Sequence, residues 1–247
     1  MRWITYIVKC LFCGLVAMQL YFAVQIALWT SLDPSSTAFQ RAERWRLCSW
    51  HWSCQVHSEW TAYNKISNNL KRAVLVSEDD IFFQHKGVRV EDMEKAWQKN
   101  QEKKHAGGKA KTALRGGSTI TQQLAKNLFL SSEQNYFRKG QELVITGLLE
   151  LILPKQRLFE IYLNSVEWGE GVFGIGAAAA HYYATTPGAL DVDQAAALAS
   201  ALPAPKCFDK AQYCRRGSIN YAARQEFILE NMSRVALAPV ASPKNPK

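Results

Sequence analysis

The longest apolar stretch of the chain lies close to its N-terminus. Residues 10–32 contain no Asp, Glu, Lys or Arg. A helix of these 23 residues would rise about 34 Å, which is enough to cross the ~30 Å hydrocarbon core of a bilayer. Trp3 and Trp29 would then lie at the two interfaces. The pattern therefore predicts one transmembrane helix over residues 10–32, after a short segment of residues 1–9.

The competing interpretation of this stretch is a cleavable signal peptide. Such peptides have a shorter apolar region, about 7–15 residues, and end at a small-x-small cleavage site. No such site closes the stretch, and a weak match at residues 36–38 lies beyond it, so we expect an uncleaved signal anchor. Arg2 and Lys9 favour a cytoplasmic N-terminus, although three arginines follow the span closely. We therefore expect residues 33–247 outside the cytoplasmic membrane.

Beyond the anchor, helical periods alternate with breaker residues. Residues 33–70 are polar and rich in aromatic residues without a clean period, which predicts a stalk. Asp191 and Gln194 have the spacing of a capping box at the start of a helix. Alternating strand patterns are nearly absent, so we expect a mainly α domain over residues 71–247. The helices predicted are residues 72–84, 91–101, 118–130, 138–153, 155–164, 177–183, 191–202 and 221–232.

One of these helices, residues 138–153, is apolar on most sides and ends at Pro154. All-round apolarity is typical of a helix that is buried in a core. We therefore expect this helix to lie at the centre of the domain. Residues 103–111, with four lysines and two glycines, instead predict a mobile basic loop.

Composition narrows the class of protein. Lys and Arg total 30 against 21 Asp and Glu, which gives a net charge of +9, and hydrophobic residues make up 48%. These values are ordinary for a globular chain and exclude a wholly disordered or collagen-like one. Six cysteines are too few for a disulfide scaffold. Cys48 with Cys54, and Cys207 with Cys214, are spaced for disulfides in an oxidising compartment, and free thiols or the opposite pairing are equally open.

Two clusters of polar residues are candidates for chemistry. Glu78, Asp79 and Asp80 are adjacent near a helix end, and a solvated acidic helix end is the ordinary interpretation of such a run. Residues 116–123, Gly-Gly-Ser-Thr-Ile-Thr-Gln-Gln, combine two glycines with a helix start whose free N–H groups attract anions, and Lys126 follows. An ordinary Gly-Gly turn with a Ser or Thr cap is the alternative, but it explains the run of hydroxyls and amides less well.

A third cluster opens the apolar helix. Arg138 and Glu142 stand four residues apart and share a helix face, with Lys139 beside them. A surface ion pair is the ordinary alternative, but a charged cluster that leads into an apolar helix favours a cleft. The Gly-x-Gly-x-x-Gly match at residues 169–174 is discounted as a nucleotide site, because no strand is expected before it.

Four motifs stand in one order along the chain. They are Glu-Asp-x-x-Phe-x-x-His-x-Gly at residues 78–87, Gly-Gly-Ser-Thr-Ile-Thr-Gln-Gln-x-x-Lys-Asn at 116–127, Arg-Lys-x-x-Glu at 138–142 and Lys-x-x-x-x-Glu-x-Tyr-Leu-Asn at 155–164. Together they resemble the peptidoglycan glycosyltransferases of glycosyltransferase family 51, over about residues 72–208. The resemblance implies a mainly α, lysozyme-like fold with a large lobe and a smaller lobe near the membrane. It also implies polymerisation of lipid II into β-1,4-linked glycan strands, with release of undecaprenyl diphosphate.

The resemblance assigns roles to particular residues. Glu78 matches the family's general base, which a poorly nucleophilic sugar hydroxyl needs. Glu142 matches its second essential carboxylate, which would organise cations or a divalent ion rather than act as a base. The positions that match the family's substrate-binding residues are Ser118, Thr119, Gln123, Lys126, Asn127, Arg138, Lys139, Lys155 and Asn164. No cofactor is certain from the resemblance, and a divalent cation, Mg²⁺ or Mn²⁺, is left open. The family's last motif usually has two adjacent arginines, whereas here Ala223 precedes Arg224.

The resemblance also implies partners and a location. The partners expected are lipid II, the growing glycan strand and an anionic membrane surface. Other cell-wall synthesis or division proteins are left open, and no nucleic acid is expected. The location expected is the inner membrane, crossed once, with the catalytic domain in the periplasm. No transpeptidase domain is expected, because the chain ends too soon for one and has no Ser-x-x-Lys motif.

Two other functions compete with this one. A lysozyme-like lytic enzyme acting on peptidoglycan would also use two carboxylates in a mostly α fold, but the Arg138–Lys139 pair and the anchor fit a diphosphate lipid better. A non-catalytic basic protein that binds membrane or nucleic acid is allowed by the net charge of +9. Release of soluble sugar fragments from finished cell wall would favour the first, and tight DNA binding without turnover of lipid II would favour the second.

Overall fold

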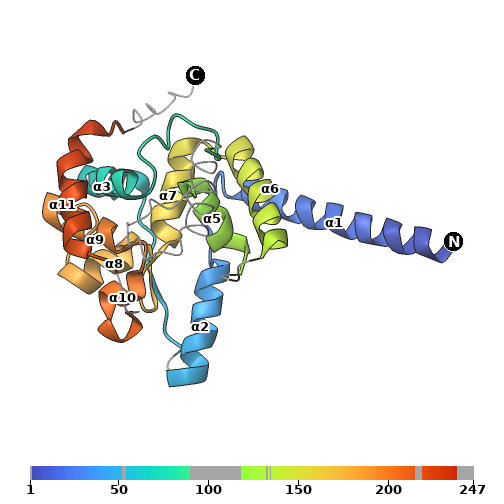
Figure 1. Ribbon diagram of the computed structural model, residues 1–247, viewed down its shortest axis with the longest axis horizontal. Coiled ribbons are helices and arrows are strands. Elements are labelled where there is room, and N and C mark those ends of the chain that lie inside the picture. The colour runs from blue at the N-terminus through green and yellow to red at the C-terminus, as the bar shows by residue number, and fades with distance from the viewer. Residues whose placement is uncertain are drawn as a thin grey trace, which may run out of the picture.

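Helices dominate the computed structural model of the chain, which describes residues 2–51, 54–89, 118–131, 133, 135–214 and 219–237 (Figure 1). The first half contains α1 (Arg2–Leu28), α2 (Ala38–His51), η1 (Tyr63–Lys65), α3 (Asn68–Glu78) and α5 (Ile120–Phe129). The second half contains α6 (Tyr136–Ile152), α7 (Lys155–Ser165), α8 (Gly174–Tyr183), α9 (Val192–Ala201), α10 (Pro205–Asp209), η2 (Ala211–Tyr213), α11 (Tyr221–Asn231) and η3 (Met232–Arg234). The predicted mainly α fold is confirmed. The helix expected at 91–101, the basic loop at 103–111 and the glycines at 116 and 117 lie outside the described residues.

Side-chain caps mark where several helices begin. Thr119 caps α5 and Asp191 caps α9, each in a capping box with the glutamine three residues later. The capping box predicted at Asp191 is therefore confirmed. By contrast, α3 begins after the Ser67 cap and ends at Glu78, several residues earlier than predicted at both ends. The chain leaves the helix at Asp79, so Glu78 stands at the C-terminal end of α3.

A small sheet lies beside α8. Its strands are β1 (His57–Ser58), β2 (Glu167–Gly169) and β3 (Val172–Phe173), and the central β3 is parallel to β1 and antiparallel to β2. Because β2 precedes the Gly-x-Gly-x-x-Gly run, the expectation that no strand stands there is wrong. The run nevertheless serves packing: Gly174 has a φ of +75°, and a Cβ there would come within 2.6 Å of the carbonyl oxygen of Asn164.

The core is centred on α7, which buries Leu158, Phe159, Ile161, Tyr162 and Leu163. On one side α5 packs against α6 and α7, and on the other α3, α9 and α11 pack against one another. The helices therefore form two groups that share one core, with α7 between them (Figure 1).

The helix expected at the centre is α6, and that expectation is wrong. Its buried residues are confined to one face: Glu142, Ile145, Thr146 and Leu149. On its other face Leu151 is 82% exposed. The sequence is apolar all round because one face packs on α5 while the other points outward beside α1.

The N-terminal helix divides into two parts. As predicted, α1 is long and apolar enough to cross a membrane, and residues 3–17 are exposed. Its C-terminal part packs on the protein instead. Ile26 is fully buried, and the rings of Phe22 and Trp29 lie 4.9 and 5.2 Å from the ring of Phe129 in α5. The bounds predicted for the span, residues 10–32, stay a prediction: the helix that could cross a membrane covers Trp3–Leu28, and residues near its end also contact protein.

Residues 33–70, expected as a stalk, belong to the folded body. Tyr63 and Ile66 join the core, and α2 buries Gln40, Glu43 and Leu47. The carboxylate of Glu43 is buried with partners, since Arg46 and Lys206 of α10 both donate hydrogen bonds to it. The stalk expectation is wrong because a helix that buries ion pairs shows no apolar period.

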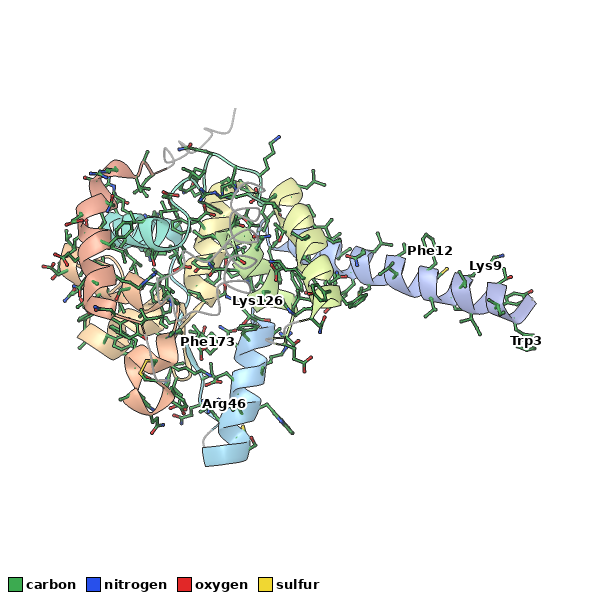
Figure 2. All side chains as sticks on the ribbon, viewed as in Figure 1. Trp3, Lys9, Phe12, Arg46, Lys126 and Phe173 are labelled. Carbon is green, nitrogen blue, oxygen red and sulfur yellow. A yellow bond between two sulfur atoms is a disulfide. The ribbon has the colours of Figure 1, made fainter. Side chains whose placement is uncertain are left out.

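Both close cysteine pairs are disulfides. Cys48 bonds to Cys54 at the end of α2, and Cys207 of α10 bonds to Cys214 after η2. A charged network lies between the segments that carry them: Arg46 pairs with Glu43 and Glu170, and Lys206 pairs with Glu43 and Glu167. Figure 2 shows Arg46 on α2 within this region. This network fastens α2 to the C-terminal part of the body.

Candidate active site

Glu78 is held by neutral donors at the end of α3. Its side chain is 12% exposed. Gln123 Nε2 of α5 donates to Oε2 at 2.8 Å, and Ser77 Oγ lies 3.0 Å from Oε1. Arg224 of α11 is the nearest cation, with Nη2 3.8 Å from Oε1. The carboxylate is therefore oriented mainly by hydrogen bonds, with Arg224 at the outer limit of an ion pair.

Gln123 is itself oriented by Tyr162 of α7. The Tyr162 hydroxyl donates to Gln123 Oε1 at 3.0 Å. Complete burial raises the pKa of Tyr162 well above its ordinary value, and the negative charges of Glu78 and Asp79 add to the effect. Because the carboxylate of Glu78 only accepts hydrogen bonds, the amide NH₂ group of Gln123 faces it, and the amide oxygen is left to accept from the Tyr162 hydroxyl.

The two aspartates after Glu78 turn away from it. Asp79 is 2% exposed, and both of its oxygens lie within 3.1 Å of His85 Nε2. Since the Gly87 N–H donates to His85 Nδ1, the ring carries its proton on Nε2 and donates it to Asp79. Asp80 pairs with Arg89 at 3.4 Å. The run is not a solvated acidic helix end, because Asp79 is buried and Arg89 pairs with both aspartates.

The start of α5 was expected to attract an anion, but Asp79 already occupies it. Asp79 Oδ2 accepts from the Ile120 N–H at 3.2 Å. The Thr119 hydroxyl donates to the Gly87 carbonyl at 2.5 Å and accepts from the Gln122 N–H. Thr119 is 3% exposed, so it joins two parts of the protein and has no free group for a substrate. Ser118, one residue earlier, is partly exposed.

Glu142 forms the centre of a second charged group on α6. Arg138 Nη1 lies 2.8 Å from Oε2, and Lys139 Nζ lies 2.5 Å from Oε1. Glu142 is 3% exposed, which excludes the ordinary surface ion pair. Arg138 and Glu142 share a face as predicted. The buried carboxylate holds two cations at fixed positions near the start of the helix.

Lys126 of α5 links the two groups. Burial lowers its pKa from the ordinary value; Glu142 and Glu78 act in the opposite direction, and Arg138 and Lys139 lower it further. Its ammonium lies 5.6 Å from the ring centre of Phe39 in α2, and Figure 2 places it at the end of α2 nearest the other helices. Lys126 therefore interacts with both carboxylates, and no described carboxylate forms a close ion pair with it.

Comparison with known proteins identifies the class of this site. The transglycosylase family model matches residues 48–233. The chain belongs to the transglycosylase family. It is 57% identical over 238 residues to the biosynthetic peptidoglycan transglycosylase of Cupriavidus metallidurans, covering 96% of this chain and 99% of that one. The proteins of the same name from Ralstonia nicotianae and Burkholderia vietnamiensis are 52% and 46% identical, and each comparison covers 96% of this chain. The comparisons cover 99% of the Ralstonia nicotianae protein and 92% of the Burkholderia vietnamiensis protein.

Membership in the transglycosylase family confirms two sequence predictions. The lysozyme-like fold is that of the matched domain, and the chain is a glycosyltransferase. The match begins at residue 48, which agrees with the finding that the expected stalk is folded.

Three residues expected to bind substrate are used inside this transglycosylase. Asn164 is 3% exposed and exchanges hydrogen bonds with the Thr61 backbone at 2.7 and 2.9 Å. Lys155 pairs with Glu150 at 2.8 Å and lies over the ring of Phe82. Asn127 is 6% exposed. Substrate binding by these three residues stays a prediction: the structure shows Asn164 and Lys155 with partners inside the protein, and Asn127 buried on α5.

The structure also brings in residues that sequence reasoning missed. Ser77, Tyr162, Arg224 and Phe39 all stand within contact of Glu78, Gln123 or Lys126. Tyr162 lies within the fourth motif and Arg224 in the family's last motif, so both had a local signal. Phe39 had none, because it lies in the segment expected as a stalk.

The donor set around Glu142 does not fit a protein-held divalent cation. Both carboxylate oxygens are already paired, with Arg138 and Lys139. Among the described residues no group of three or more His, Cys, Asp or Glu could hold a metal. Mg²⁺ and Mn²⁺ prefer several oxygen ligands, whereas both oxygens of this carboxylate are paired with cations. The cations themselves are the groups available to neutralise a phosphate.

Proposed function

We propose that this transglycosylase polymerises lipid II into β-1,4-linked peptidoglycan glycan strands and releases undecaprenyl diphosphate. One observation carries the proposal: the two carboxylates that match the family's essential pair have different surroundings. Glu78 is held by neutral donors, whereas Glu142 is paired with two cations. A base beside a cluster of cations is what glycosyl transfer from a diphosphate requires.

In the proposed reaction, the acceptor 4-hydroxyl oxygen attacks the anomeric carbon of the donor sugar while Glu78 takes the hydroxyl proton. The bond between that carbon and the diphosphate oxygen breaks, and its electron pair leaves with undecaprenyl diphosphate. Attack opposite to the leaving group converts the α linkage of the donor into the β linkage of the product. A single displacement therefore accounts for the product.

Lys126, Arg138 and Lys139 are the cations placed to stabilise the leaving diphosphate. Negative charge grows on the diphosphate in the transition state, and donors that are already fixed need no reorganisation at that moment. Glu142 supplies the fixation, because its two oxygens hold Arg138 and Lys139. In this proposal Glu142 positions cations and does not touch the attacking hydroxyl.

The test is incubation of the full chain with labelled lipid II, followed by gel separation of the glycan products. Glu78→Gln should lower the polymerisation rate by about 10²–10⁴-fold, which is typical for loss of a general base. Asp80→Asn is the matched control, because that carboxylate pairs with Arg89 away from Gln123, and it should retain most of the activity. Equal small losses would remove Glu78 as the base. Release of soluble fragments from finished cell wall, without polymer from lipid II, would identify a lytic enzyme instead.

The location that we propose is the inner membrane, with the N-terminus in the cytoplasm and the body in the periplasm. Two features support it: the exposed apolar part of α1 and two disulfides, which form in oxidising compartments. The mature protein should retain its first residues and fractionate with the inner membrane. Recovery of a soluble form that begins near residue 33 would contradict this location.

A further inference from the structure

A reciprocal pair of amides joins α1 to the helix that carries the cations. Gln19 Nε2 of α1 donates to Gln141 Oε1 of α6 at 3.1 Å, and Gln141 Nε2 donates back to Gln19 Oε1 at 3.2 Å. The two residues are 122 positions apart in the sequence. Because each amide bonds to the other, the pair favours one height of α6 along α1 and one rotation of α6, in addition to its packing on α5.

The surroundings of Gln19 are apolar. Its neighbours along α1 include Leu15, Val16 and Leu20, which are 47%, 40% and 60% exposed. An amide group without a hydrogen-bond partner is unfavourable in an apolar medium. The Gln19 side chain therefore favours the position in which a partner is available. Gln141 is the only partner of the Gln19 amide among the described residues.

Gln141 lies directly before Glu142 on α6. Residues 138, 139 and 142 present their side chains to the cation cluster, while residue 141 faces α1. A rotation of α6 that broke the amide pair would also turn Glu142. In the first turn Tyr136 and Phe137 are 96% and 79% exposed, so the turn is held by the Asn135 cap and by the ion pairs with Glu142 rather than by apolar packing.

We propose that Gln19 is a positioning residue for glycosyl transfer. Through Gln141 it sets the orientation of Arg138, Lys139 and Glu142, so that the anchor helix is a working part of the diphosphate-binding site. This inference rests on the proposed function, since the cation cluster matters only if a diphosphate leaves there. It assigns to α1 a role that membrane attachment alone does not require.

The kinetic test compares Gln19→Leu, Gln141→Leu and the double variant as full-length proteins. Each single change should lower kcat for lipid II polymerisation on the order of threefold to tenfold, in line with interhelical polar contacts in membranes. The KM should change less than the affinity for free undecaprenyl diphosphate, because the intact donor lacks the terminal charge that the cations stabilise. The double variant should be no worse than either single variant. Gln25→Leu is the matched control, because the Gln25 amide donates to Tyr21 within α1. It should behave as wild type.

A merely structural pair would give a different pattern. Lower thermal stability or lower membrane content with an unchanged kcat per folded molecule would overturn the proposal. So would a kcat loss in Gln25→Leu equal to that in Gln19→Leu, because the effect would then belong to the helix as a whole.

A crosslinking test is independent of the reaction. Cysteines placed at positions 19 and 141, in a Cys10→Ser and Cys13→Ser background, should be joined by a short bifunctional thiol reagent in membranes. Cysteines at positions 25 and 141 should not be joined. Absence of the first crosslink would overturn the inference even if polymerisation is observed. A crosslink in a protein that fails to polymerise lipid II would instead place the failure in the proposed function.

Binding of undecaprenyl diphosphate alone supplies a third measurement. Gln19→Leu should weaken that binding severalfold, and Gln25→Leu should leave it unchanged. Equal affinity in wild type and Gln19→Leu would show that the amide pair does not position the cations.

Discussion

The hydroxyl of Tyr162 donates a hydrogen bond to Gln123 at 3.0 Å, and Gln123 in turn donates to Glu78 at 2.8 Å. The direction of these two hydrogen bonds is set by the carboxylate of Glu78, which only accepts, and the buried Tyr162, whose pKa is raised, keeps the proton that it donates to the amide oxygen. A core residue on α7 therefore holds the free end of an amide on α5 whose other end donates to the carboxylate on α3. The position of the proposed base depends on all three helices.

Removal of the Tyr162 hydroxyl should disturb Glu78 without touching it. In Tyr162→Phe, Gln123 Oε1 loses its donor, which should cost about 1–3 kcal/mol of unfolding free energy and lower polymerisation about tenfold. Tyr63→Phe is the control, because the Tyr63 hydroxyl is buried without a hydrogen-bond partner among the described residues. Unfolding and rate measurements on both variants check this. A rate for Tyr162→Phe equal to that of Tyr63→Phe would exclude the relay.

Arg138 and Glu142 should act as one element. Arg138→Ala and Glu142→Gln should each reduce the polymerisation rate, and the double variant should lose less than the sum of the two in free energy, by about 0.5–3 kcal/mol. The Lys155–Glu150 pair, which lies at the other end of α6, is the control. Lys155→Ala should lower stability more than kcat, since Lys155 is used within the protein. Fully additive losses for Arg138 and Glu142 would separate their roles.

The unfolding free energy should depend on Glu167 between about pH 4.5 and 7. Burial raises the pKa of Glu167 to about 7; Lys206 acts in the opposite direction and Glu43 adds to the rise. Since the folded pKa lies above the unfolded one, the stabilising contribution is complete below about pH 4.5 and is lost as pH rises through 7. Its size should be on the order of 1–3 kcal/mol. Glu167→Gln should flatten this part of the profile, and an unchanged slope would contradict the assignment.

The Cys207–Cys214 disulfide should contribute measurably to stability. A loop of this length predicts a loss of about 2 kcal/mol when the bond is removed, on the chain-entropy account. Cys207→Ser with Cys214→Ser should therefore lower the unfolding free energy. Cys10→Ser with Cys13→Ser is the control, since both thiols are free and exposed, and should have little effect. Equal stability of the two double variants would show that the disulfide does not stabilise the body.

Several features of this protein followed from the sequence because they depend on neighbours in the chain. The capping box at Asp191 needs only Gln194, and the Arg138–Glu142 contact needs only one helical turn. The four motifs indicated the family, because their residue types and their order along the chain can be recognised without knowledge of the fold. Local geometry and the order of motifs along the chain can both be inferred from the sequence alone.

Only the tertiary structure showed which partner each apolar or polar segment contacts. The sequence predicted a membrane span that includes residues 22–29 and a core position for α6. An apolar pattern alone does not distinguish contact with lipid from contact with protein. Thr119 read as a substrate contact, yet its hydroxyl joins Gly87 to α5. Glu78 gains its surroundings from Gln123, Tyr162 and Arg224, which lie on three other helices. Such environments form only when distant helices pack, and packing is settled by the burial of the whole core rather than by any one segment.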